Sequence, residues 1–260
     1  IDRINDDCFQ AGLECMKDFN ALCKQHKVSS LTAIGTSALR SAVNGQEFRT
    51  RVLQETGIDI EIVSGEEEAR FISLGITHHL ESSECNYVIM DIGGGSVEFI
   101  LMNDTVKAQE ISVNIGISEL RAKLKYSEPM TDQEFAENQD LIRLKMGKAL
   151  DDIRNSRPEC IVGASGPFEI IETIHGMNPN PAGNRFEAAK IKSIARSIVG
   201  KTYDERYTMP GMPDERADLS LESMMLIWLM LDKINSINTI VVSPYALKEG
   251  IIVDKYFRLA

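Results

Sequence analysis

Three consecutive glycines stand between two apolar runs at residues 88–101, which read VIMDIGGGSVEFIL. Apolar runs on both sides of a glycine turn predict two neighbouring strands joined by a tight connection. Glycines lack the side chains that would hold a phosphate away from the backbone, so their N–H groups can point at its oxygens. The segment is therefore consistent with a phosphate cradle. Spacing alone leaves a flexible hairpin with solvated acids at its ends equally open.

Acidic residues flank the glycines, with Asp91 before them and Glu98 after them. An Asp at a strand end can hold a hydrated Mg2+ beside a phosphate, because this cation keeps several waters and takes only one or two carboxylates. Ser96 adds a hydroxyl. Two common phosphate motifs do not match: a Walker loop needs a Gly-Lys-Ser/Thr ending, and the dinucleotide fingerprint needs a helix where VEFIL continues as a strand.

Helical and strand patterns alternate along the chain, which predicts the α/β class. Residues 1–27 and 36–57 have helical periodicity, the second interrupted at Asn44 and Gly45, and short strand patterns follow each. Residues 87–115 indicate successive antiparallel strands, and residues 131–155 a helical region with a capping box from Thr131 to Glu134. The polar segment at 82–86 is the expected domain boundary. A last strand at 239–244 precedes a closing helix.

Composition restricts the classes of partner. The chain has 260 residues and a net charge of −11, which argues against non-specific binding to nucleic acid or to an anionic membrane. Its longest apolar run, MMLIWLML, is far shorter than the roughly 20 residues of a membrane span. The cysteines form no C-x-x-C pair, and Cys8, Cys15 and Cys23 recur at helical spacing, which predicts core thiols of a cytoplasmic protein.

A second acidic motif, VSGEEEAR, covers residues 63–70. Ser64 and Glu67 match a capping box, and acids in a first helical turn complement the helix dipole, which accounts for Glu66 and Glu67. Glu68 lies further into the helix and could act as a general base on a water. From the residues alone, capping and solvation are the stronger interpretation.

Two further segments place small polar residues where a strand gives way to a helix. In TSALR, Thr36, Ser37 and Arg40 suit an anion, but Thr36 or Ser37 could equally be a helix cap. In IVGASGPFE, a second phosphate or a nucleotide could bind at Gly163, Ser165 and Gly166, and a close-packed connection is the alternative. Pro167 fits a first helical turn.

In this order, the motifs resemble those of the exopolyphosphatase / guanosine pentaphosphate phosphohydrolase family, over nearly the whole chain. The resemblance implies two ribonuclease H-like domains of the actin-like ATPase superfold with a cleft between them. It also implies Mg2+-dependent hydrolysis of a terminal phosphoanhydride in inorganic polyphosphate or guanosine pentaphosphate. The motifs that carry it are TSALR, NGQEF, VSGEEEAR, DIGGGSVE, GASG and PGMPDERADLS.

The same resemblance implies a role for each site residue. The catalytic Glu of the family falls on Glu68, and the metal-associated acids fall on Asp91 and Glu98. The phosphate-binding residues expected are Thr36, Ser37, Arg40, Gly93, Gly94, Gly95, Ser96, Gly163, Ser165 and Gly166. We expect residues 1–85 to be the remainder of domain I, 86–244 domain II, and 245–260 a closing helix that packs back on domain I.

The chain also departs from the family pattern. Members open with a strand and a first phosphate loop, of the form Asp-x-Gly-Ser/Thr-Asn, and no such segment precedes the first helix here. If the polypeptide begins at Ile1, we expect weak or absent activity and an unstable first domain. Short chains are also expected to be less processive on long polyphosphate.

Three functions follow from these patterns. The first is a Mg2+-dependent phosphoanhydride hydrolase, with polyphosphate or guanosine pentaphosphate as its anionic partner and a homodimer as one compatible assembly. The second is a non-catalytic sensor or binding protein for the same anions. The third is a sugar-kinase-like transferase, against which VSGEEEAR argues.

Overall fold

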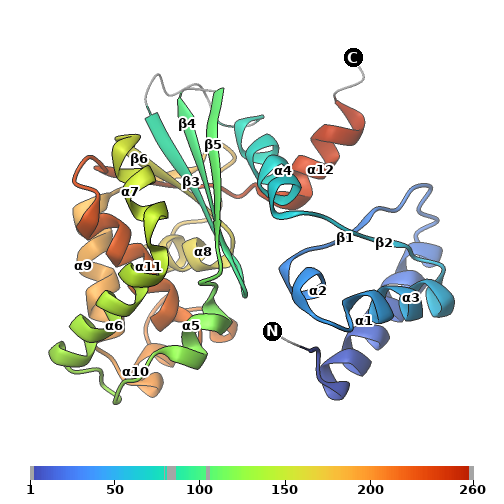
Figure 1. Cartoon of the computed structure of the whole chain (residues 1–260), viewed down its shortest axis with the longest axis horizontal. Coiled ribbons are helices and arrows are strands. Elements are labelled where there is room, and N and C mark those ends of the chain that lie inside the picture. Colours follow the sequence, from blue (N-terminus) through green and yellow to red (C-terminus); the bar gives the residue numbers. More distant parts are fainter. Residues whose placement is uncertain (1–2, 79, 81–85, 104–105, 258–260) are drawn as a thin grey trace. The chain divides into compact units, whose positions relative to one another are not determined.

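Two sheets organise the computed structural model, which describes residues 3–78, 80, 86–103 and 106–257 (Figure 1). A two-stranded parallel sheet pairs β1 (Ala33–Gly35) with β2 (Ile60–Ile62). A six-stranded mixed sheet has the strand order β5-β4-β3-β6-β8-β7. The chain divides into two units, Ile1–Glu68 and Ala69–Ala260. The α/β class predicted from the alternating patterns is confirmed.

The first unit contains the small sheet with α1 (Asp6–Gln25), α2 (Ser37–Ser41) and α3 (Gly45–Thr56). Helix α3 begins at Gly45, where the Asn-Gly pair was expected to interrupt the helical pattern. Its core is small, because short strands and one face of each helix supply few apolar side chains. That core consists of Leu13, Phe48, Val52, Ile58 and Ile60.

The cysteine prediction is wrong for two residues of α1. Cys8 and Cys15 are exposed, because the helix buries only a narrow stripe around Leu13. Phe19 and Leu22, from the same apolar pattern, are also 54% and 49% exposed. Phe19 lines an apolar hollow of about 420 Å³, together with Met16, Cys23, Leu31, Thr32, Ala33, Ile34, Leu39, Phe48, Ile58 and Ile60.

The second unit is built on the six-stranded sheet. The strands β3 (Asn86–Ile92), β4 (Val97–Asn103) and β5 (Val106–Val113) are successively antiparallel, as predicted for residues 87–115. Next to β3, β6 (Cys160–Ala164) and β8 (Thr239–Val242) run parallel to it. The edge strand β7 (Asn184–Glu187), antiparallel to β8, was not predicted, because four residues with alternating burial give a weak sequence pattern.

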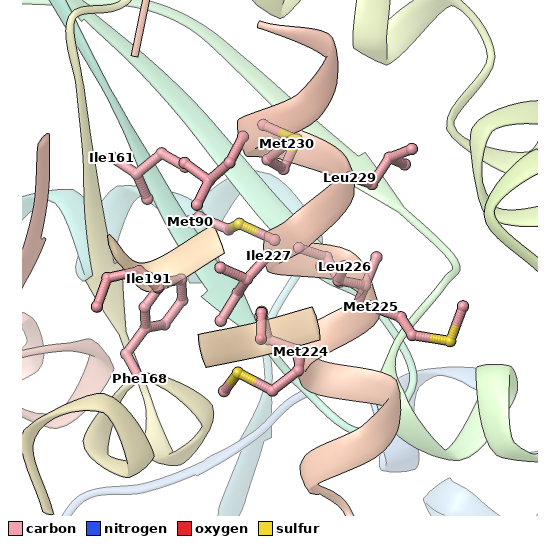
Figure 2. Close-up of a cluster of buried hydrophobic side chains, with 14 of the residues drawn as sticks. Met90, Ile161, Phe168, Ile191, Met224, Met225, Leu226, Ile227, Leu229 and Met230 are labelled. Carbon is pink, nitrogen blue, oxygen red and sulfur yellow. The ribbon is translucent and has the colours of Figure 1, made fainter. Parts of the chain in front are cut away.

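One face of this sheet carries most of the helices (Figure 1). They are α5 (Ile117–Lys123), α6 (Asp132–Met146), α7 (Lys148–Asn155), α8 (Gly166–Ile174), α9 (Ala188–Val199) and α11 (Ser220–Lys233), with α10 (Tyr203–Tyr207) and the 3-10 turn η1 (Asp214–Arg216) nearby in sequence. Helix α11 contains the MMLIWLML run and lies at the centre of the core. Figure 2 shows its side chains against those of the sheet and of α8 and α9, at Met90, Ile161, Phe168, Ile191, Met224, Met225, Leu226, Ile227, Leu229 and Met230.

The helical region predicted at 131–155 is divided in two. Thr131 caps α6 and forms a capping box with Glu134, as expected. The helix ends at Gly147, which has φ 50°, and α7 begins at the next residue. A left-handed backbone conformation cannot continue a right-handed helix, so the glycine ends α6.

The opposite face of the sheet is covered by α4 (Gly65–Thr77) and α12 (Leu247–Tyr256). Ala69, Ile72 and Ile76 of α4 share a core with Ala246 and Leu247 and with the sheet, so contacts assign α4 from Ala69 onward to the second unit. The domain boundary expected at 85/86 remains a prediction, and its polar segment falls partly outside the described residues. No helix in the described part of the chain is long and apolar enough to cross a membrane.

A carboxyl group is buried within the helical layer. Glu222 on α11 is fully buried, and the Tyr126 hydroxyl donates to its Oε1 at 3.2 Å. Its Oε2 has no hydrogen-bond partner among the residues that the structure describes. Burial raises the pKa of the Glu222 carboxyl, because the charged form loses its hydration.

Replacement of Glu222 by Gln should stabilise the protein at neutral pH, by about 1 kcal/mol or more, since the buried charge is removed. The parent is expected to lose stability as pH rises from the ordinary carboxyl pKa through the raised one, because only its folded state then keeps the proton. Urea unfolding from pH 4 to 8 would measure the difference. The exposed Glu215→Gln is the control, and a Glu222→Gln variant less stable than its parent at pH 7 would contradict the prediction.

Candidate active site

The glycine segment forms the connection from β3 to β4. Its backbone carbonyls accept hydrogen bonds from the residues at the start of α5. Ile117, Ser118 and Gly116 donate their N–H groups to the carbonyls of Gly93, Gly94 and Gly95, at 3.0, 2.8 and 3.2 Å. These three donors lie at the start of α5. A backbone turn held through its carbonyls is fixed in orientation without any side chain of its own.

The N–H groups of the same loop have a different role. Gly93 N–H donates to the Ser96 carbonyl at 2.9 Å and closes the turn. Within the described residues, no protein acceptor takes the N–H of Gly94 or Gly95. The loop therefore offers donors in a fixed orientation, as an anion-binding backbone concavity does.

Close contact between the loop and α5 depends on a second glycine position. A Cβ atom at Gly116 would lie 2.4–2.5 Å from the backbone of Gly94 and Gly95. A Cβ at Gly94 would meet nothing nearer than the Ser118 Oγ, at 3.6 Å. Gly116 is thus required by packing, whereas a Cβ at Gly94 would make only an ordinary van der Waals contact.

The two predicted metal-associated acids share one row of the sheet. Asp91 on β3 is directly opposite Glu98 on β4. Side chains at opposed positions have Cβ atoms about 4.5–5.5 Å apart, and like charges there are unfavourable. Among the described residues, no cluster of three or more His, Cys, Asp or Glu side chains could hold a metal. Mg2+ binding by Asp91 and Glu98 therefore remains a prediction.

Two hydroxyl groups orient the Glu98 carboxylate, which is 1% exposed. Ser96 Oγ donates to its Oε1 at 2.6 Å, and Ser112 Oγ donates to the same oxygen at 3.0 Å. Ser112 is opposite Glu98 on β5, so the row continues into a third strand. Sequence analysis missed Ser112, because no local signal specifies the register of β5 on β4.

The GASG segment lies at the end of β6, next to the end of β3. Gly163 is inside β6, in register with Met90, and the Phe168 ring occupies the space that a side chain at Gly163 would need. Packing against Phe168 accounts for the glycine at 163, and phosphate binding by Gly163 remains a prediction. Ser165 hydrogen-bonds to the backbone of Ile92, at the end of β3.

Gly166 begins α8, and the guanidinium group of Arg216 lies against it, 2.2–2.4 Å from an ideal Cβ position. Pro167 occupies the first helical turn, as expected. Arg216 belongs to the PGMPDERADLS motif, but sequence analysis assigned it no role. Its proximity to α8 depends on how η1 packs, which no spacing in the sequence specifies.

Two predicted residues meet in the first unit. The Arg40 Nη1 donates to Glu68 Oε2 at 3.0 Å and to the Val63 carbonyl at 2.9 Å. Glu68 is 7% exposed, so its carboxylate is largely removed from solvent. Its other oxygen, Oε1, makes no hydrogen bond within the described part of the chain.

The remaining predicted polar residues lie at the starts of helices. Ser64 Oγ accepts from the Glu67 N–H at 3.1 Å, so one half of the expected capping box is present. Thr36 occupies the position before α2, but its hydroxyl makes no capping hydrogen bond, and Ser37 is the first helical residue. Phosphate binding by Thr36 and Ser37 remains a prediction.

Comparison with known proteins gives the same assignment as the motifs. The model of the Ppx/GppA phosphatase family matches residues 2–258. The chain belongs to this family. The exopolyphosphatase 1 of Mycobacterium leprae is 25% identical over 243 residues, which are 92% of this chain and 71% of that protein.

Solved structures agree in fold. An exopolyphosphatase from Cytophaga hutchinsonii has a TM-score of 0.88 at 28% identity. The alignment covers 96% of this chain and 82% of the Cytophaga hutchinsonii chain. The type II variant of the Aquifex aeolicus Ppx/GppA phosphatase has a TM-score of 0.78 at 25% identity, with coverages of 98% and 84%. Family membership confirms the predicted actin-like ATPase fold type and the predicted enzyme class, a hydrolase acting on acid anhydrides.

Substitution of Gly116 should separate α5 from the glycine loop. We expect Gly116→Ala to lower the free energy of unfolding by about 1–3 kcal/mol, because the added methyl group overlaps backbone atoms that cannot move aside freely. Gly94→Ala is the matched control and should change stability by less than about 0.5 kcal/mol. Urea unfolding of the two variants measures the difference, and equal stabilities would refute the close-packing role of Gly116.

Proposed function

We propose that this protein removes terminal phosphate from inorganic polyphosphate by Mg2+-dependent hydrolysis. The observation that carries the proposal is the orientation of the glycine loop. Its carbonyls are bound to α5 while the N–H groups of Gly94 and Gly95 have no protein acceptor among the described residues. The relative from Mycobacterium leprae is named an exopolyphosphatase, in agreement with this substrate class.

The loop would bind the phosphoryl group that is released. Backbone N–H groups in a fixed orientation stabilise charge on phosphoryl oxygens without reorganisation during the reaction. They carry no net charge, so they can be placed beside the Asp91 carboxylate. A protein of net charge −11 can therefore bind a polyanion through local donors instead of a general positive surface.

Asp91 and Glu98 are the residues that would hold Mg2+. The fit rests on their opposed positions in one row of the sheet and on oxygen donors alone, which this cation prefers. The hydroxyls of Ser96 and Ser112 fix the Glu98 carboxylate in orientation. When bound, Mg2+ would neutralise charge on the phosphoryl oxygens.

Glu68 is the proposed general base. Arg40 holds its Oε2, so Oε1 is the oxygen that would accept a proton from the attacking water. The water oxygen attacks the terminal phosphorus, the bond to the bridging oxygen breaks, and orthophosphate and a shortened chain result. Arg40 then acts on the orientation of the base, in addition to the phosphate contact predicted from TSALR.

Guanosine pentaphosphate is the second substrate to be compared. It contains the same terminal phosphoanhydride, so the groups proposed above would serve both reactions. The preference between the two substrates depends on how the protein contacts the rest of each molecule beyond the terminal phosphate. A comparison of the two kcat/KM values measures this preference.

The central test is Glu68→Gln, assayed by phosphate release from polyphosphate and from guanosine pentaphosphate. We expect a loss of about 10²–10⁴-fold in kcat, since the amide cannot accept the proton of the attacking water. Glu67→Gln is the matched control, because Glu67 lies one residue earlier in α4 and is exposed. A Glu68→Gln variant as active as its parent would show that another group is the base.

The metal role has its own test. Activity should disappear with EDTA and return with Mg2+, and Asp91→Asn should require at least about tenfold more Mg2+ for half-maximal activity, because one anionic ligand is lost. Isothermal titration of Mg2+ into the parent and Asp91→Asn proteins provides a readout that does not depend on turnover. Unchanged Mg2+ binding by Asp91→Asn would exclude Asp91 as a ligand.

A further inference from the structure

Ser165 has a backbone conformation that L-amino acids rarely adopt. It lies between β6 and α8 with φ 81° and ψ 166°. Glycine enters this region without steric conflict, whereas a side chain there is strained. A serine at this position therefore suggests that its side chain contributes something that glycine cannot.

The hydroxyl of Ser165 makes two hydrogen bonds with a single residue of the neighbouring strand. It accepts from the N–H of Ile92 at 3.2 Å and donates to the Ile92 carbonyl at 3.2 Å. It makes no capping bond to α8, although it occupies the N-cap position. The regular pairing of β3 with β6 ends one residue earlier, at Asp91 and Ala164. The side chain thus continues the strand pairing by one step.

The donor capacity of this hydroxyl is used up by the contact. A serine hydroxyl has one proton and two acceptor lone pairs. The proton is directed at the Ile92 carbonyl and one lone pair accepts from the Ile92 N–H. Phosphate oxygens are acceptors, so Ser165 Oγ can donate to a phosphate only after the bond to Ile92 is broken.

Ile92 has a position from which it can affect the whole loop. It follows Asp91, the proposed metal ligand, and precedes Gly93, the first residue of the glycine turn. Its side chain is 3% exposed and belongs to the main core, so the residue is anchored on one side by packing. The Ser165 hydroxyl fixes its two backbone polar groups on the other side.

We infer that Ser165 is a positioning residue, which holds the Asp91–Gly93 backbone through Ile92, and not the phosphate ligand that its motif suggested. The inference rests on the proposed function for its catalytic consequence, since the group positioned is the proposed phosphate and metal loop. The hydrogen bonds themselves can be tested without any turnover.

The test compares Ser165→Gly with Ser165→Ala. Both variants lose the hydroxyl, but glycine also relieves the backbone strain, so Ser165→Gly should unfold at no lower urea concentration than the parent. Hydrogen exchange of the Ile92 amide should become up to about tenfold faster in both variants, the ratio expected for one lost hydrogen bond. In phosphate release from polyphosphate, both should lose about tenfold or more in kcat, with KM changed by less than about twofold.

Ser156→Ala is the control. Its hydroxyl donates to the Ile153 carbonyl at 2.8 Å, and its backbone carbonyl accepts from Asn86 at the opposite end of β3. This variant should leave both the Ile92 exchange rate and the kcat unchanged, because it removes a serine hydroxyl that lies near the opposite end of β3 and makes no contact with the loop.

Two results would overturn the inference. A raised KM with an unchanged kcat and an unchanged Ile92 exchange rate would identify Ser165 as a phosphate ligand. Full activity of Ser165→Gly with normal exchange would show that the hydroxyl has no role in the loop. If the parent releases no phosphate from polyphosphate, the proposed function fails, and the exchange rate at Ile92 still decides whether Ser165 holds the backbone.

Discussion

The structure around the candidate site depends on one constraint: a backbone loop can bind an anion through its N–H groups only if its carbonyls are satisfied elsewhere. Buried or partly buried carbonyls without partners are unfavourable, and carbonyls facing a phosphate would repel it. Helix α5 meets this constraint by donating three N–H groups to the glycines at 93–95. Gly116 allows the approach, since any larger residue would overlap the loop backbone.

The two acidic residues of the sheet lie on either side of the same glycine turn. Asp91 and Glu98 are opposed because the turn between β3 and β4 sets their register. Glu98 is nearly fully buried, which is tolerable because two hydroxyls donate to it. The loop and the two acids therefore lie together at one end of β3 and β4, where the proposed function requires a phosphate and Mg2+.

Local features of the structure were accessible from the sequence, because their causes lie within a few residues. The capping box of Thr131 and Glu134, the helix break before Gly45 and the strand pair around the glycines each depend on neighbouring side chains or on glycine itself. Features that depend on partners far along the chain were missed or misassigned. Cys15 shares the apolar periodicity of α1 and yet is exposed, since periodicity cannot tell which part of a stripe finds a partner.

The candidate site also combines features that are visible in the sequence with contacts that only the fold creates. The order of the motifs and the family resemblance predicted roles for Glu68, Asp91, Glu98 and the glycine loop, and these roles remain predictions. Figure 1 shows the elements that carry them.

By itself, the sequence determined the α/β class, the phosphatase family and the residue types available for catalysis. Only the tertiary structure decided that Arg40 holds Glu68, that Ser112 reaches Glu98 from a third strand, and that the Ser165 hydroxyl is engaged by Ile92. The physical reason is that hydrogen-bond partners are set by strand register and helix packing, which bring together residues separated by tens of positions in the chain.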